Sequence, residues 1–295
     1  MRIFGVVLMM CLCCGLRAEQ TISEPELLAT GYVFTEGPVW CKEGNYMLFS
    51  DIRGNAIQKW SEAKGAEVFL SPSQKSNGIT YDGKDFYICR YLERDVAKLT
   101  PDGKATSIVS QYKGKKFNCP NDLIVTNKGN IYMVDPGFGM TEDQIRELDF
   151  QGLFLIAKGS SEAVLVDESL PKPNGVALSP NQELLYLCET SENIVYSYEL
   201  EDNGMLSNKK VFCKVTGKGS LDGLTVYEKT GHLFVALGSG GIVVVDPQGN
   251  IVDRIMFNNK ESVRNMCFGG DNGDTLYITA GTSLYRFNYD LSKIK

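Results

Sequence analysis

The stretch PNGVALSPNQELLYLCET, residues 173–190, contains the unit from which most of the chain is built. A polar residue and a glycine, Asn174 and Gly175, precede a short apolar run and a turn at Ser179-Pro180-Asn181. A second apolar run, Leu185-Tyr186-Leu187-Cys188, follows the turn. Turn residues between two runs rich in aliphatic and aromatic side chains are typical of a β-hairpin. The stretch therefore predicts two antiparallel strands, with Asn174 at the start of the first.

The same unit recurs five more times along the chain. Its landmark residues follow one another at intervals of 41, 44, 53, 48 and 43 residues: Glu36, Asn77, Asn121, Asn174, Asp222 and Asn265. A third apolar run often completes the unit, as at residues 242–245. Repeats of 40 to 50 residues made of short strands and Gly, Asp or Asn turns are typical of β-propeller blades.

The repeat predicts an all-β fold, a six-bladed β-propeller that forms a single domain over residues 19–295. A single blade cannot bury both faces of its sheet, so the blades must pack around a common axis. Residues 27–34 have strand-like composition and precede the first landmark, whereas the last unit ends soon after its third strand. We therefore expect the N-terminal segment to supply the outer strand of the last blade. Helical periodicity is limited to residues 141–148, where a turn of helix is expected.

The N-terminus has the pattern of a signal peptide over residues 1–18. Arg2 precedes an apolar stretch at residues 3–16 that is too short to span a bilayer comfortably, and Ala18 precedes polar residues. These features predict a secreted or periplasmic protein with no stable membrane span after processing; an uncleaved anchor is the alternative. Cleavage would change the formal net charge from −6 to −8 and leave six of the nine cysteines. Disulfides are then allowed, although Cys89 and Cys188 lie inside apolar runs and are better explained as buried side chains.

Composition and motifs exclude several classes of function. The chain is acidic, and its longest basic run is the short segment 113–116, so nucleic acid is not expected as a partner. It contains no G-x-S-x-G elbow, Walker loop or dinucleotide fingerprint. Its one histidine, His232, begins a second strand and is expected at the end of its blade far from the landmark residues. A histidine-based triad is therefore not expected.

The landmark residues predict a cation site. The first strand of each propeller blade lines the central channel, so residues in the same repeat phase should form a ring at one depth. Taken singly, Asn and Asp also favour turns. Together, the six landmarks offer two carboxylates and four amides, with no imidazole or thiolate. Such oxygen ligands suit a hard divalent cation, calcium first, with magnesium, manganese or zinc as alternatives.

The ends of the second strands should return to the same mouth of the channel. Four charged residues occupy these ends: Asp51, Arg90, Asp135 and Glu189. They are candidate substrate-binding residues, and solvated loop charges are the alternative explanation.

Several motifs also carry a family resemblance. The segments Glu36-Gly37-Pro38-Val39-Trp40, Asn118-Cys119-Pro120-Asn121-Asp122, Asp135-Pro136-Gly137 and Asp222-Gly223-Leu224 resemble those of the gluconolactonase/senescence-marker-protein family over roughly residues 30–290. The resemblance implies a six-bladed propeller with one catalytic divalent metal in its channel. It implies metal ligation by Glu36, Asn174 and Asp222, with Asn121 as a fourth ligand or substrate contact. It also implies that Asn77 and Asn118 face the substrate.

The expected function is metal-dependent hydrolysis of a small-molecule lactone. In this hypothesis the cation polarises the lactone carbonyl, and Asp222 is both a ligand and the general base that activates water. A diisopropylfluorophosphatase-like phosphotriester hydrolase is one alternative. A non-catalytic binding propeller with a structural metal is another, from a different class of protein.

Overall fold

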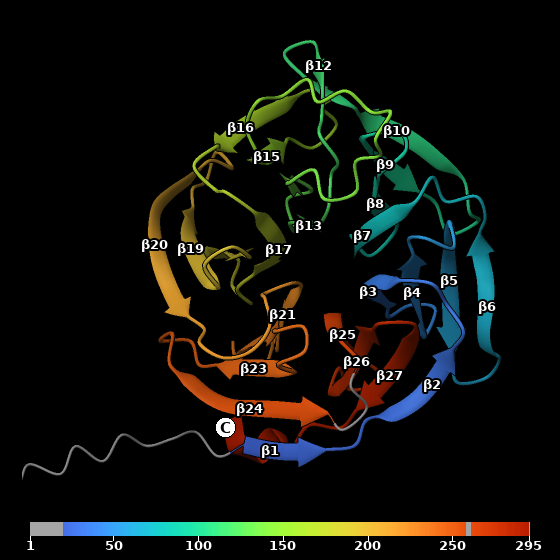
Figure 1. Ribbon diagram of the computed structural model, residues 1–295, viewed down its shortest axis with the longest axis vertical. Coiled ribbons are helices and arrows are strands. Elements are labelled where there is room, and N and C mark those ends of the chain that lie inside the picture. Colours follow the sequence, from blue (N-terminus) through green and yellow to red (C-terminus); the bar gives the residue numbers. More distant parts are fainter. Residues whose placement is uncertain (1–19, 258–260, 295) are drawn as a thin grey trace, which may run out of the picture.

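The computed structural model describes residues 20–257 and 261–294, which form six antiparallel sheets around a common axis (Figure 1). The predicted all-β, six-bladed propeller is confirmed. The predicted signal peptide, residues 1–18, lies outside the described residues. The described part of the chain contains no helix with the length and apolar character that a membrane crossing requires.

Each blade has its first strand nearest the axis and its later strands progressively further out (Figure 1). The first blade contains β3 (Thr35–Cys41), β4 (Tyr46–Asp51), β5 (Ala56–Ser61) and β6 (Gly65–Leu70). The second contains β7 (Ser76–Tyr81), β8 (Phe86–Arg90), β9 (Asp95–Leu99) and β10 (Ala105–Val109). The third contains β13 (Leu123–Val125), β14 (Ile131–Asp135), β15 (Gly152–Ile156) and β16 (Ala163–Asp167). The fourth contains β17 (Pro173–Leu178), β18 (Leu184–Glu189), β19 (Ile194–Leu200) and β20 (Leu206–Lys214). The fifth contains β21 (Leu224–Val226), β22 (Leu233–Ala236), β23 (Ile242–Val245) and β24 (Ile251–Phe257). The sixth contains β25 (Val263–Gly269), β26 (Thr275–Ala280) and β27 (Ser283–Phe287).

The N-terminal segment closes the ring, as the sequence predicts. Strand β2 (Glu26–Thr30) pairs antiparallel with β27 and becomes the fourth strand of the sixth blade. Figure 1 shows the blue N-terminal strands lying against the red and orange C-terminal ones. A strand that the sequence analysis missed, β1 (Gln20–Ser23), pairs in parallel with the outer edge of β24.

Apolar side chains form one layer between each pair of neighbouring blades. For example, Tyr132 and Leu153 of the third blade pack against Val176 and Leu187 of the fourth. Met47 and Phe49 of the first blade pack with Tyr277 and Leu284 of the sixth, so the core continues across the closure. The core is therefore distributed around the ring, which leaves the axis available for polar side chains.

Each inner strand is irregular at its landmark residue. The pairing register shifts between Ser76 and Ile79 in the second blade, and between Pro173 and Val176 in the fourth. A β-bulge of this kind re-aims a side chain away from the regular alternation of the sheet. Asn77 and Asn174 lie inside these shifts, which is why their side chains point to the axis rather than into an inter-blade layer.

Two further features complete the fold. Residues 111–116 form a small hairpin of β11 (Gln111–Tyr112) and β12 (Lys115–Lys116), and a 3₁₀ helix, η1, covers Leu291–Ile294. The helical turn expected at residues 141–148 is not present; this segment contains only a short turn, closed by the amide of Gln144 and the carbonyl of Thr141. Cys89 and Cys188 are fully buried, and no disulfide forms among the described cysteines.

Candidate metal and active site

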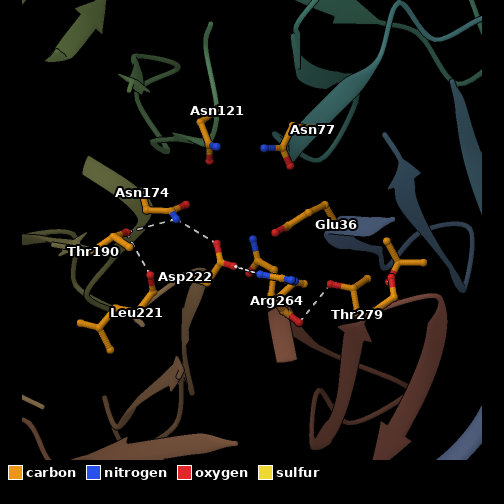
Figure 2. Close-up of polar contacts among 12 residues, drawn as sticks. Glu36, Asn77, Asn121, Asn174, Thr190, Leu221, Asp222, Arg264 and Thr279 are labelled. Carbon is orange, nitrogen blue, oxygen red and sulfur yellow. Dashed lines mark hydrogen bonds and ion pairs between the residues drawn. The ribbon is translucent and has the colours of Figure 1, made fainter. Parts of the chain in front are cut away.

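A cavity of about 440 Å³ opens at the end of the axis where the landmark residues lie. Five of the six landmark side chains line it and point toward a common space (Figure 2): Glu36, Asn77, Asn121, Asn174 and Asp222. The structure thus brings together the four predicted metal ligands and the predicted substrate residue Asn77. Phe34, Ile52 and Phe138 form an apolar part of the wall.

Tyr91 orients two of the amides. The side-chain nitrogen of Asn77 donates to the Tyr91 hydroxyl at 2.6 Å, and that of Asn121 donates to the same oxygen at 2.9 Å. Since both nitrogens are held by the tyrosine, the two amide oxygens face the cavity (Figure 2). Tyr91 is buried, and burial raises its pKa well above the ordinary value, so the hydroxyl stays neutral.

A second set of hydrogen bonds orients Asn174. Its nitrogen donates to Asp222 Oδ1 at 2.9 Å and to Thr190 Oγ1 at 3.3 Å, and the Thr190 hydroxyl donates to the carbonyl of Leu221. With both donors occupied on one side, the Asn174 oxygen points into the cavity.

The two carboxylates lie close to one another; Glu36 is buried, and the side chain of Asp222 is 17% exposed. One oxygen of Glu36 accepts the backbone amide of Gly37 at 2.9 Å. Burial raises the pKa of Glu36 well above its ordinary value, and the negative charge of Asp222 raises it further. Burial also raises the pKa of Asp222, to about 6, against the opposing influence of Arg264 and Asn174.

This donor set fits a hard cation. Carboxylate and amide oxygens converge from five blades, and the hydrogen bonds that hold the amide nitrogens keep them turned away from the shared space. Two desolvated carboxylates at close range repel one another, and a divalent cation between them would remove that cost. Within residues 20–257 and 261–294, no group of three or more His, Cys, Asp or Glu side chains is arranged so that it could hold a metal ion by itself. Asparagine oxygens therefore have to supply part of any coordination shell in this cavity.

The sixth landmark was assigned to the wrong residue. Asn265 does not line this cavity; its side chain accepts the amide of Met266 and lies beside a cavity at the other end of the axis. The register of β25 shifts between Val263 and Asn265, so the bulge presents Arg264 instead. Arg264 Nη1 lies 3.4 Å from Asp222 Oδ2. The ring of landmark positions thus includes a cationic side chain, Arg264, that the sequence analysis did not expect.

The structure does not bring the predicted substrate contacts at the second-strand ends into the cavity lining. Asp135 accepts the backbone amides of Asn118 and Cys119, and Glu189 accepts those of Lys172, Ser191 and Glu192. Arg90 forms an ion pair with Asp95 in the same blade. Asp51 accepts the amides of Phe34 and Gly54. Buried loop amides need acceptors, and a carboxylate at the end of the preceding strand supplies them. The alternative explanation, solvated loop charges, is wrong for Asp51, Asp135 and Glu189, because these carboxylates are buried.

Asn118 is likewise outside the cavity lining. It is fully buried, and its side-chain nitrogen donates to the carbonyl of Phe150 at 2.8 Å. Asn118 packs against Gly137, next to Phe138, so it supports the wall of the cavity.

His232 lies where the sequence predicts. Its Nδ1 is hydrogen-bonded to Thr230, and its backbone carbonyl accepts the amide of Tyr227, which lines the cavity at the opposite end of the axis. The histidine is therefore separated from the landmark side chains by the length of the inner strand.

Three contributors to the site escaped the sequence analysis: Tyr91, Thr190 and Arg264. Tyr91 and Thr190 each directly follow a charged residue at the end of a second strand, Arg90 and Glu189. The residue after the strand end was thus the useful signal, rather than the strand end itself.

The fold and the cavity together define a six-bladed β-propeller with an oxygen-lined polar site on its axis. Residues 34–282 match the family model described as the SMP-30/Gluconolactonase/LRE-like region, and the chain belongs to this family. A gluconolactonase of Zymomonas mobilis is 34% identical, with 90% of this chain and 81% of the relative aligned. A pentonolactonase of Haloferax volcanii is 26% identical over 83% of this chain and 80% of its own.

Solved structures agree with the fold. A gluconolactonase from Xanthomonas campestris superposes with a TM-score of 0.81 at 28% identity, covering 88% of this chain and 87% of its own. A calcium-binding protein, regucalcin, from Agrobacterium tumefaciens has a TM-score of 0.76 at 18% identity, covering 92% of this chain and 95% of its own. The second likeness concerns the fold alone.

Proposed function

We propose that this protein is a metal-dependent lactonase whose active site is the oxygen-lined cavity. The observation that carries the proposal is the convergence of Glu36, Asn121, Asn174 and Asp222 with all three amides, including Asn77, turned to present oxygen. The names of its relatives, gluconolactonase and pentonolactonase, support a sugar lactone as the substrate class. The apolar stretch at residues 3–16 supports export of the mature enzyme.

Glu36, Asn121, Asn174 and Asp222 would hold the cation, and calcium is the first choice for an all-oxygen donor set. When bound, a divalent cation supplies positive charge that draws electrons from the lactone carbonyl and stabilises the developing oxyanion. Asn77 is placed to accept from a substrate hydroxyl through its side-chain oxygen, because its nitrogen donates to Tyr91. Phe34, Ile52 and Phe138 exclude water from one side of the cavity.

Asp222 is the proposed general base. The water oxygen forms a bond to the carbonyl carbon while Asp222 accepts the water proton. The bond from the carbonyl carbon to the ring oxygen then breaks, and the proton returns to that oxygen, which becomes a hydroxyl group. The product is a hydroxy acid that ionises to a carboxylate.

The test is an assay of the mature protein on sugar lactones, aliphatic lactones and phosphotriesters, with calcium and with chelator. We expect hydrolysis of hydroxylated lactones that depends on the cation. Phosphotriester turnover without lactone turnover would favour the diisopropylfluorophosphatase-like alternative. Calcium binding without turnover of any of these esters would favour a binding propeller.

A further inference from the structure

Among the described residues that line the oxygen-lined cavity, Arg264 is the one with a cationic side chain. It occupies the position in the sixth blade at which the other five blades present a carboxylate or an amide (Figure 2). Its guanidinium carbon lies 4.8 Å from the centre of the Phe34 ring, and its Nη1 lies 3.4 Å from Asp222 Oδ2. Phe34 is itself fixed, since its backbone amide donates to Asp51. The guanidinium is thus held beside the proposed base and not simply exposed at the mouth.

Most of the hydrogen-bonding capacity of Arg264 is unused. A guanidinium has five N–H donors, and across residues 20–257 and 261–294 Asp222 is the partner with which Arg264 shares a hydrogen bond, a long one at 3.4 Å. The Nε atom is buried with no hydrogen-bond partner. An unpaired donor on a charged, desolvated group is costly, and an anion in the cavity would give the guanidinium a partner.

The net charge of the cavity indicates which kind of anion would bind beside Arg264. Glu36, Asp222 and Arg264 together carry a charge of −1 when both acids are ionised, so a bound divalent cation changes the cavity to +1. One monovalent anion then balances the loaded cavity. A hydroxy acid produced by lactone opening is such an anion, and Ser239 and Ser262, which line the same cavity, could hydrogen-bond its hydroxyl groups.

We propose that Arg264 is a specificity-determining residue that lowers the affinity of the cavity for the cation and raises its affinity for the hydroxycarboxylate product. The inference rests on the proposed function. Without Arg264 the loaded cavity would be neutral, and a carboxylate would gain less by entering it. With Arg264 the same excess positive charge is present for the oxyanion that develops during ring opening.

The test is calorimetric titration of Arg264→Met, first with calcium and then with D-gluconate on the calcium-saturated protein. Removing a positive charge beside Asp222 should tighten calcium binding by several-fold, up to about tenfold, in a partly screened site. Gluconate binding should weaken by about tenfold or more. The two affinities are expected to move in opposite directions, which loss of structure would not produce.

Three controls sharpen the result. Arg264→Lys keeps the charge but loses the planar fork, so calcium affinity should stay within about twofold while gluconate binding weakens by a few-fold. If Arg264→Met fails to fold, this variant carries the test. Arg53→Met removes the same charge from an exposed residue whose guanidinium also lies near the Phe34 ring, at 5.0 Å, and should change neither affinity. D-Glucitol, which lacks the carboxylate, should not distinguish the wild type from Arg264→Met.

Several outcomes would overturn the proposal: a wild type that binds no calcium or no gluconate, unchanged gluconate affinity in both Arg264 variants, or weaker calcium binding in Arg264→Met. The titrations use no lactone and no turnover. Opposite shifts in a protein that hydrolyses no lactone would therefore refute the proposed function while leaving the role of Arg264 in place.

Discussion

The chemistry of the cavity depends on which end of each asparagine faces the axis. An amide can present oxygen or nitrogen to a ligand, and only oxygen binds a cation. In this chain the choice is made by neighbours: Tyr91 accepts from Asn77 and Asn121, and Asp222 and Thr190 accept from Asn174. The side chains that neighbour the asparagines thus determine which atoms the site presents to a ligand.

Tyr91→Phe tests this orientation at the level of one oxygen atom. The variant keeps the buried ring but removes the acceptor shared by two amides, so their nitrogens lose a partner and the amides can rotate. We expect calcium affinity to fall by about tenfold, the equivalent of one buried hydrogen bond, with little change in fold. Calcium titration by calorimetry measures it. The control is Thr225→Val, which changes a residue that lines the cavity at the other end of the axis and should leave calcium affinity unchanged. Equal losses of calcium affinity in the two variants would contradict the orienting role of Tyr91.

Asp222 and Glu36 should respond differently to amide replacement. Asp222→Asn keeps one carbonyl oxygen but cannot accept a proton near neutral pH, so turnover should drop by roughly 10²-fold or more even with saturating calcium. Glu36→Gln loses only a ligand charge, and added calcium should largely restore its turnover. The measurement is lactone hydrolysis against calcium concentration for both variants.

His232→Asn is the matched control for these two substitutions, because this histidine lies at the other end of its blade. Turnover should stay within a few-fold of the wild type. If calcium rescues Asp222→Asn as fully as Glu36→Gln, Asp222 is only a ligand; a loss of about 10²-fold or more in His232→Asn would move the chemistry away from the landmark residues.

At the scale of the strand, the residue after each landmark is as important as the landmark for the geometry of the site. Gly175 donates its amide to the carbonyl of Asp222 in the next blade, and Gly223 donates to the carbonyl of Arg264. Gly37 has a φ of +51°, and a Cβ placed there would lie 2.1 Å from the backbone oxygen of Asn77. The bulges therefore place neighbouring inner strands in backbone contact, which fixes the spacing of the landmark side chains.

Gly37→Ala should be strongly destabilising, by about 3 kcal/mol or more, because it adds a clash with backbone to an unfavourable φ. Gly65→Ala is the matched control: its φ is +69°, but nothing lies within 4 Å of the added Cβ. It should cost about 1–2 kcal/mol, the conformational term alone. Urea unfolding of both variants measures the difference; equal losses would show that the first blade can shift away from the second.

The sequence predicted the architecture well because a propeller repeats one hairpin, and each repeat carries its own turn signals. The same periodicity singled out six landmark residues, and the family resemblance selected four of them as metal-ligand candidates. What periodicity could not supply was the length of a bulge, so Asn265 was chosen where the structure presents Arg264. It also could not reveal contacts between blades, such as Tyr91 with Asn121. The end-of-strand acids Asp135 and Glu189 were misassigned because their loop amides are recognisable as partners only after the loops are folded.

At the scale of the whole molecule, all six blades contribute side chains to the oxygen-lined cavity. The apolar layers between blades hold neighbours together in pairs, and β2 closes the sixth blade through its pairing with β27. A ligand bound on the axis would instead connect blades across the ring. Separating the blades would then require its release, so cation binding should be coupled to global stability.

Calcium should therefore raise the unfolding temperature of the wild type. A ligand that binds only the native state stabilises it by about 2.7 kcal/mol at a concentration 100 times its Kd. For a chain of this size the corresponding shift is roughly 5 °C. Thermal unfolding followed by circular dichroism, with calcium and after exhaustive chelation, measures it.

Asp222→Ala and Glu36→Ala each remove one carboxylate from the cavity and should lose most of the shift in unfolding temperature. Asp82→Ala removes an exposed acid in a turn and should keep the shift. An undiminished shift in the two cavity variants would place the stabilising cation elsewhere on this acidic protein, and an unfolding temperature indifferent to chelation would separate the cavity from any role in holding the blades together.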